Sequence, residues 1–133
     1  MKKVLILCLS FSVYLSSLGQ NQSKTSSIDF VAVVNNNHAE TLYYYQNNWK
    51  VLREAALKKN YIDSYNLLEI EPTDATPYNF ILITTYANQE QYNNREAHFE
   101  ELINNAGGLK LLNDKKPEDF RTFIHGQDSV KNL

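Results

Sequence analysis

The chain has 133 residues, with 13 Lys and Arg against 15 Asp and Glu, a formal net charge of −2 at pH 7 and 43% apolar residues. This length indicates one small domain, and the slightly acidic balance argues against a nucleic-acid partner, which needs clustered basic residues. The single cysteine, Cys8, excludes a disulfide within the chain and a thiolate metal site, so a hydrophobic core must stabilise the fold.

Residues 1–19 have the pattern of a secretory signal peptide. A short lysine-containing start precedes an apolar stretch from Val4 to Leu18, and Ser17 and Gly19 place small residues before a cleavage site at Gln20. The stretch is short for a membrane span, which needs about 20 mostly apolar residues, although an uncleaved anchor is the alternative. We therefore expect a secreted or periplasmic protein whose mature chain has lost Cys8 and two lysines.

The first half of the remaining chain predicts a tether, a strand and a helix. Residues 20–27 are polar and predict a flexible tether, and residues 28–34 (IDFVAVV) predict a strand. A helix follows, with Asn37 as N-cap, Glu40 closing a capping box and Asn60 as a left-handed exit. Its apolar face has helical spacing and consists of Leu42, Tyr45, Trp49, Leu52 and Ala56.

The second half predicts three strands and a helix. Residues 61–71 and 78–86 are expected strands, separated by a turn over residues 72–77. Asn88 is the expected N-cap of a second helix with Gln91 in the capping-box position, and Gly107 and Gly108 end that helix. The expected buried positions of this helix are Tyr92, Phe99, Leu102, Ile103 and Ala106. Residues 120–125 predict a last strand of a domain over 28–126, and residues 127–133 a polar tail.

The order of these elements is β-α-β-β-α-β, which predicts an α+β ferredoxin-like fold with a four-stranded antiparallel sheet. In that fold the first and third strands are central. The segments 28–34 and 78–86 are continuously apolar, whereas 61–71 and 120–125 contain polar residues that suit edge strands. The hydropathy of the strands therefore agrees with the order of the elements.

The two central strands are apolar on both faces. Phe30 and Ala32 alternate with Val31 and Val33, and residues 80 and 82 alternate with 81 and 83 in the same way. Two helices cover only one face of a four-stranded sheet, so we expect a homodimer in which a second copy covers the other face. The alternative is a monomer whose connection Leu109–Pro117, of undetermined form, folds across that face.

With this pattern, residues 29–125 resemble the dimeric α/β-barrel superfamily, which includes stress-responsive barrel domains and antibiotic-biosynthesis monooxygenase-like proteins. The resemblance rests on element order and two-faced strands and implies that two ferredoxin-like subunits pack sheet to sheet. Members of that superfamily include cofactor-free oxygenases, haem-handling proteins and isomerases. Fold likeness alone does not choose among these activities.

No strong catalytic motif is present in the sequence. It contains no glycine-rich phosphate loop, no GxSxG elbow and no HExxH, and we expect neither a metal nor a cofactor. His38 at a helix start and Tyr86 at a strand end are the weak catalytic candidates. Tyr45, Trp49, Arg53 and Tyr86 are the candidate ligand-binding residues, because aromatic walls beside an arginine suit a pocket between sheet and helices.

Three functions remain open from the sequence. The leading hypothesis is an exported small domain that binds a small apolar or aromatic molecule in a sheet–helix cavity. The first alternative is a cofactor-independent monooxygenase-like enzyme that uses His38 with Tyr86 or Trp49. The second alternative is a structural accessory protein whose exposed tyrosines bind a protein partner. A large cavity would separate the first two hypotheses from the third.

Overall fold

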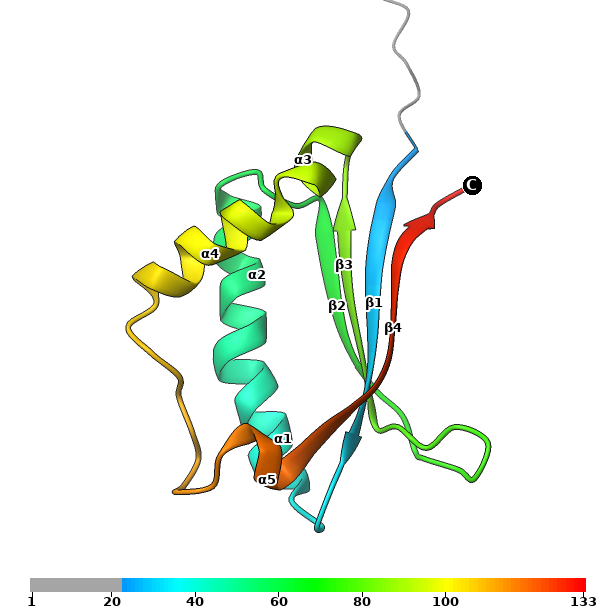
Figure 1. The fold of residues 1–133 in the computed structure, drawn as a ribbon, viewed down its shortest axis with the longest axis vertical. Coiled ribbons are helices and arrows are strands. Elements are labelled where there is room, and N and C mark those ends of the chain that lie inside the picture. The colour runs from blue at the N-terminus through cyan, green and yellow to red at the C-terminus, as the bar shows by residue number, and fades with distance from the viewer. Residues whose placement is uncertain (1–22) are drawn as a thin grey trace, which may run out of the picture.

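The fold is α+β, with a four-stranded antiparallel sheet and all helices on one of its faces (Figure 1). A computed structural model describes residues 23–133. The predicted signal peptide, its cleavage site and the beginning of the predicted tether lie outside these residues.

The sheet has the strand order β2-β3-β1-β4, and every neighbouring pair is antiparallel. Its strands are β1 (Thr25–Val33), β2 (Ser64–Glu69), β3 (Phe80–Tyr86) and β4 (Arg121–Lys131). The two continuously apolar segments are therefore the central strands, β1 and β3, and the more polar ones are the edges. Central strands have a neighbouring strand on each side, whereas edge strands have one side open to solvent, and polar residues suit such exposed edges.

The first helical segment is continuous and consists of α1 (His38–Tyr44), the π-helical turn η1 (Tyr45–Trp49) and α2 (Lys50–Lys58). It ends as predicted, because Asn60 has a φ of 57°. The predicted capping box at its start is wrong. The Asn37 side chain caps no helix N–H and instead donates a hydrogen bond to the Asp119 carbonyl at 3.0 Å, while Glu40 binds the distant Lys115.

The second helical segment is divided into α3 (Gln89–Asn93) and α4 (Arg95–Asn105), with Asn94 between them. The predicted N-cap is confirmed, since the Asn88 side chain accepts a hydrogen bond from the Gln91 backbone N–H at 2.8 Å. The predicted end is also confirmed. Gly107 and Gly108 have φ values of 76° and 97°, which glycine adopts with little strain.

Both ends of the predicted domain need correction. Thr25–Ser27 belong to β1 rather than to the tether, and residues 127–131 belong to β4 rather than to the polar tail. The predicted last strand also begins one residue too early, because Phe120 ends the short helix α5 (Pro117–Phe120). The two strands lengthen by pairing with each other, with Thr25 opposite Lys131. Backbone hydrogen bonds form this ladder, so polar side chains are compatible with it.

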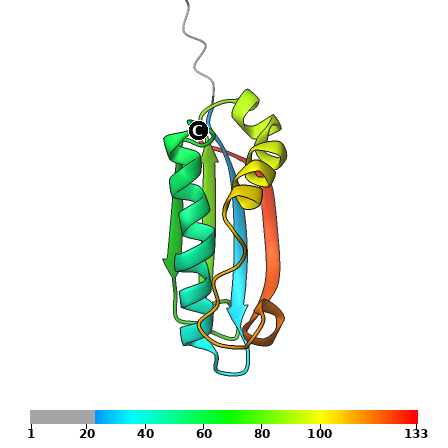
Figure 2. The same ribbon diagram turned by 90° about the vertical axis from the view of Figure 1, so that its left-hand side faces the viewer.

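The connection that follows α4 runs along the outside of the helices (Figure 2). Asn48 holds it with two hydrogen bonds to the backbone of Lys110, both at 2.8 Å. Further along, the Lys115 ammonium contacts Glu40 at 2.6 Å and Asn37 at 2.5 Å. The connection is therefore tied to the helical face, and the alternative in which it folds across the opposite face of the sheet is wrong.

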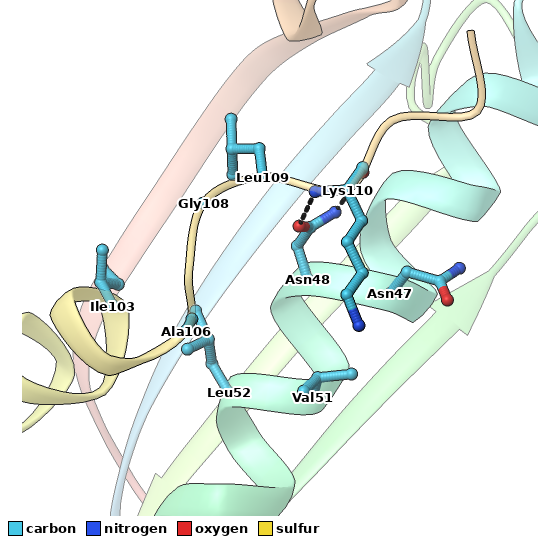
Figure 3. Close-up of a pocket in the computed structure, with 9 residues that line it drawn as sticks. All are labelled: Asn47, Asn48, Val51, Leu52, Ile103, Ala106, Gly108, Leu109 and Lys110. Atoms are coloured by element: carbon cyan, nitrogen blue, oxygen red, sulfur yellow. Dashed lines mark hydrogen bonds between the residues drawn. The ribbon is translucent and has the colours of Figure 1, made fainter.

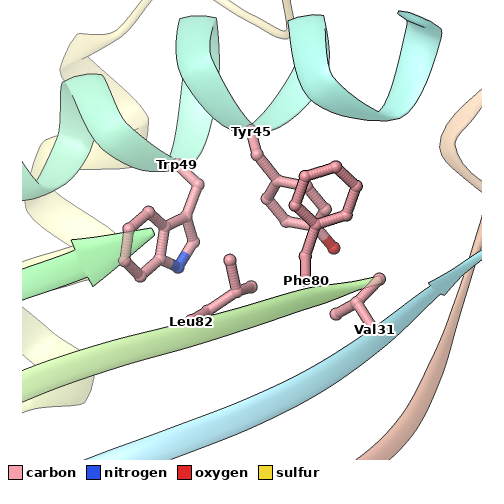
Figure 4. Packing of buried hydrophobic residues seen from close by; sticks show 5 residues of the cluster. All are labelled: Val31, Tyr45, Trp49, Phe80 and Leu82. Atoms are coloured by element: carbon pink, nitrogen blue, oxygen red, sulfur yellow. The ribbon is translucent and has the colours of Figure 1, made fainter. Parts of the chain in front are cut away.

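The helices bury one face of the sheet. Figure 4 shows Tyr45 and Trp49 of η1 pointing onto β3, where they meet Phe80 and Leu82 beside Val31 of β1. A second buried cluster, consisting of Ala56, Ile62, Tyr86, Tyr92 and Leu102, joins α2 to α3 and α4. We call the other face of the sheet the open face, because no helix of residues 23–133 covers it.

Candidate functional site

Two adjoining cavities lie between the helices and the sheet, near β1 and β4. Their volumes are about 270 and 190 Å³, and Asp29 of β1 lines both. We call the two together the sheet–helix cleft. Ligand sites commonly have volumes of roughly 300–1,000 Å³, and the larger cavity is close to the lower end of that range.

The four predicted ligand-binding residues all line this cleft. Tyr45 and Trp49 line the smaller cavity, and Arg53 and Tyr86 line the larger one. Tyr45, Trp49 and Tyr86 are buried, and Arg53 is half-buried. The helical spacing of residues 45, 49 and 53 brings the first three together along η1 and α2, and β3 supplies Tyr86.

Arg53 is fixed between two aromatic rings. Its guanidinium carbon lies 4.4 Å from the centre of the Trp49 ring and 4.2 Å from the centre of the Phe99 ring. Its Nε donates a hydrogen bond to the Thr84 hydroxyl at 3.2 Å. Burial lowers the pKa of Arg53 to about 10, so the side chain remains a cation at neutral pH. The result is a positively charged group of fixed orientation on the helix side of the cleft.

Asp29 is a negative group on the sheet side, on the central strand β1. It is half-buried, and burial raises the pKa of its carboxyl, against the opposing effect of the positive charge of Arg53. Opposite Asp29 on β4 is Gly126, where an added Cβ would lie 3.1 Å from Asp29 Oδ1 and 2.8 Å from Phe123 Cζ. Glycine at this position therefore lets the Phe123 ring pack over the backbone of β4, beside the Asp29 carboxylate.

Two of the phenols that line the cleft, those of Tyr45 and Tyr86, are neutral hydrogen-bonding groups at neutral pH. Burial raises the pKa of Tyr45 to about 12 and also raises the pKa of Tyr86. The Tyr86 ring packs edge-on against Tyr92, with ring centres 5.4 Å apart. Because a raised pKa keeps the phenol protonated at neutral pH, Tyr86 suits a wall or a hydrogen-bond donor better than a proton acceptor.

A third cavity, of about 180 Å³, lies between α2 and the connection after α4 (Figure 3). We call it the outer pocket. Its walls are mainly the apolar side chains of Val51, Leu52, Ile103, Ala106 and Leu109, and Asn48 fixes its rim through the backbone of Lys110. Ile103 also lines the larger cavity of the sheet–helix cleft, so the two hollows share a wall.

Large apolar side chains are left exposed around these hollows. Phe123 of the smaller cavity is 56% exposed, Ile103 of the shared wall is 56% exposed and Leu109 of the outer pocket is 61% exposed. Ile103 and Ala106 were expected to be buried, and both predictions are wrong, because these side chains are exposed at the outer pocket. Apolar side chains gathered around a hollow are typical of ligand-binding or interaction sites.

The two catalytic candidates do not share a site. His38 is exposed at the start of α1, where its Nε2 contacts Glu69 Oε1 and its ring lies 5.7 Å from the Phe80 ring. Tyr86 is at the other end of β3, about 20 Å away by the rise of a strand. The geometry therefore does not combine His38 with Tyr86 in one reaction.

Sequence reasoning missed Asp29, Phe123 and Gly126 as residues of the site. Asp29 gave a usable signal, because it is the one charged residue in an otherwise apolar central strand. Phe123 and Gly126 gave none, since their positions depend on how β4 pairs with β1. The pairing has register shifts on both sides of the Asp29–Gly126 pair, and these determine which β4 residues face the cleft.

Among residues 23–133, no three His, Cys, Asp or Glu side chains are grouped closely enough to hold a metal ion. Within the same part of the chain, no helix has the length and hydropathy of a membrane span. No protein-family model and no curated protein sequence matches the chain.

Proposed function

We propose that this chain is an exported binding protein that holds a small aromatic or apolar molecule in the sheet–helix cleft. The observation that carries the proposal is the clamped guanidinium of Arg53, which lies between Trp49 and Phe99 beside a cavity. An arginine stacked on aromatic rings provides both a flat apolar surface and a fixed charge. The exposed apolar side chains around the cleft further support a ligand with an apolar part.

Fluorescence of Trp49 provides a direct test, because it is the only tryptophan in the chain. A library of small aromatic and aliphatic compounds is titrated against the protein. At least one class is expected to change the emission with a saturable curve, because Trp49 lines the cleft. A flat response across the library would contradict the proposal.

Variants of exposed residues make this test specific. Phe123→Ser is expected to weaken binding with little loss of stability, since Phe123 is more than half exposed. Leu57→Ser is the matched control, because Leu57 is 39% exposed on α2 and lines none of the three hollows. Equal losses of affinity in the two variants would contradict binding in the cleft.

Binding is preferred over the oxygenase alternative because the residues required for catalysis are separated. His38 and Tyr86 lie at opposite ends of β3, and Trp49, the other suggested partner of His38, lies in the core cluster of the helical face. The accessory-protein alternative depends on exposed tyrosines. Tyr45, Tyr86 and Tyr92 are instead buried, which favours a role in the core and in the cleft.

We also propose that the subunit is ferredoxin-like and that a second copy of the chain packs on the open face. The strand order β2-β3-β1-β4 supports the first part. The second part is supported by side chains such as Ile28, Phe30, Ile81 and Ile83, which share the face opposite the buried Val31 and Phe80. The cross-strand partners of these residues on β2 and β4 are Asn66, Leu68, His125 and Gln127.

The charge of the open face favours a copy of the same chain as its partner. A two-fold axis brings identical side chains together, so a face that carries acids or bases of one sign repels its own copy. None of the paired residues named above is Asp, Glu, Lys or Arg. A face with an apolar centre and no Asp, Glu, Lys or Arg among these paired positions does not repel its own copy.

A further inference from the structure

The charged groups of the larger cavity differ in whether they have partners within residues 23–133. Arg95 donates a hydrogen bond to the Tyr92 carbonyl at 2.9 Å and has an ion pair with Glu96 at 3.6 Å. Asp128 accepts a hydrogen bond from the Ser27 hydroxyl at 2.6 Å. Three of the five charged side chains that line the cavity are therefore engaged with protein groups.

Asp29 and Arg53 are the other two. Within the described residues, the Asp29 carboxylate has neither a hydrogen bond nor an ion pair. Arg53 uses its Nε on Thr84 and has no carboxylate of residues 23–133 within 4.0 Å. Because the Trp49 and Phe99 rings lie against its guanidinium, the free donors of Arg53 are its two Nη atoms, at the edge of that plane. A cation and an anion thus line the same cavity without contacting each other.

We propose that the ligand of the sheet–helix cleft is a small aromatic zwitterion, whose anionic group binds the Nη atoms of Arg53 and whose ammonium group binds the carboxylate of Asp29. This inference rests on the proposed function and specifies the ligand class. Arginine binds a carboxylate with two parallel hydrogen bonds, which suits the fixed guanidinium. An ammonium group beside Asp29 offsets the cost of burying its carboxylate, and Asp29 lines both cavities of the cleft.

Three probes that share one aromatic ring separate the contributions of the two charges. Phenylalanine carries both charged groups, 3-phenylpropionate carries only the anion and 2-phenylethylamine carries only the cation. None of them has an indole, so each can be titrated against Trp49 fluorescence in the mature protein at pH 7. Phenylalanine is expected to bind at least about tenfold more tightly than either single-charge probe, since charge-assisted hydrogen bonds are the strong ones.

Carboxylate-to-amide variants identify the residue that binds the ammonium. Asp29→Asn is expected to remove the preference for phenylalanine over 3-phenylpropionate while leaving the affinity for 3-phenylpropionate equal or higher. Glu96→Gln is the matched control, because Glu96 lines the same cavity but already has an ion pair with Arg95. Glu96→Gln should keep the preference, and circular dichroism verifies that both variants are folded.

The outcomes distinguish this inference from the proposed function. Equal affinities for phenylalanine and 3-phenylpropionate in the unmodified protein would overturn the zwitterion assignment and leave the binding function standing. Retention of the preference in Asp29→Asn would overturn the role of Asp29. Absence of binding for every compound, the three probes and the whole aromatic and aliphatic library included, would overturn the function and the ligand class together.

Discussion

The guanidinium of Arg53 lies over the ring of Trp49, 4.4 Å from its centre. This stacking holds the charged side chain against the wall of the sheet–helix cleft. A pair of this kind stabilises the domain and also shapes a binding surface. The contribution to stability and the contribution to binding can be measured separately.

Trp49 is the residue where this separation is clearest. Trp49→Ala is expected to lower the free energy of unfolding by about 3–5 kcal/mol, because it leaves a cavity in the core. Trp49→Phe keeps most of the packing and should cost less, yet it changes the ring that supports Arg53. We expect Trp49→Phe to weaken ligand binding, measured by calorimetry, by more free energy than it removes from the free energy of unfolding. Phe80→Leu, in the same cluster but not lining the cleft, is expected to lower stability and leave affinity unchanged.

Asp29 predicts a dependence of stability on pH. Its pKa is raised in the fold, so the folded state binds more protons than the unfolded state, and stability falls as pH rises from the ordinary value of 3.8 through the raised value. Asp29→Asn removes this cost. The variant is expected to melt at a higher temperature than the unmodified protein at pH 7, with the gain disappearing below pH 3.8. A variant that is less stable at pH 7 would show that Asp29 stabilises the fold.

Gly126 predicts a steric effect in the cleft. In Gly126→Ala, the new methyl group occupies the space beside Asp29 and displaces the ring of Phe123, which is exposed and free to move. Ligand affinity is therefore expected to fall about tenfold, while stability falls by about 1 kcal/mol, at the low end for an overpacked site. Gln127→Ala, on the adjacent position of β4, is the control for both measurements. Unchanged affinity in Gly126→Ala would place the ligand elsewhere.

The open face predicts an effect on assembly. Val33 packs against the core cluster under the helices, whereas Ile83 is on the open face, so only Ile83→Lys tests the interface without damaging the core. Multi-angle light scattering is expected to give a dimer for the mature protein at micromolar concentration and a monomer for Ile83→Lys. Leu57→Lys, an exposed apolar-to-lysine change on α2, should remain dimeric. A monomeric unmodified protein would contradict the dimer.

The sequence predicts best those features that local chemistry determines. The φ of 57° at Asn60 and the cap of α3 at Asn88 follow from the preferences of the residue types at helix ends. Periodicity also predicts the central strands and the buried positions of Tyr45 and Trp49. These features require no knowledge of distant contacts.

Features that depend on distant partners were missed. Asn37 and Glu40 form a plausible capping box, but the fold brings residues 113–119 close to them, and contacts with Asp119 and Lys115 replace the box. In the same way, Thr25–Ser27 and residues 127–131 read as polar ends, although each forms a strand because the other is beside it. Neither segment shows this in its own composition.

The pairing of Thr25 with Lys131 determines how the domain responds to mechanical force. The Asn132 backbone N–H also bonds to the Lys24 carbonyl at 3.0 Å, so both ends of the described chain leave the sheet at the same end. Tension applied between the two ends breaks the backbone hydrogen bonds between β1 and β4 one after another. A sheet loaded in this direction resists little force. The same proximity lets a short linker join residues 24 and 132, with new termini opened in the exposed turn over residues 72–77.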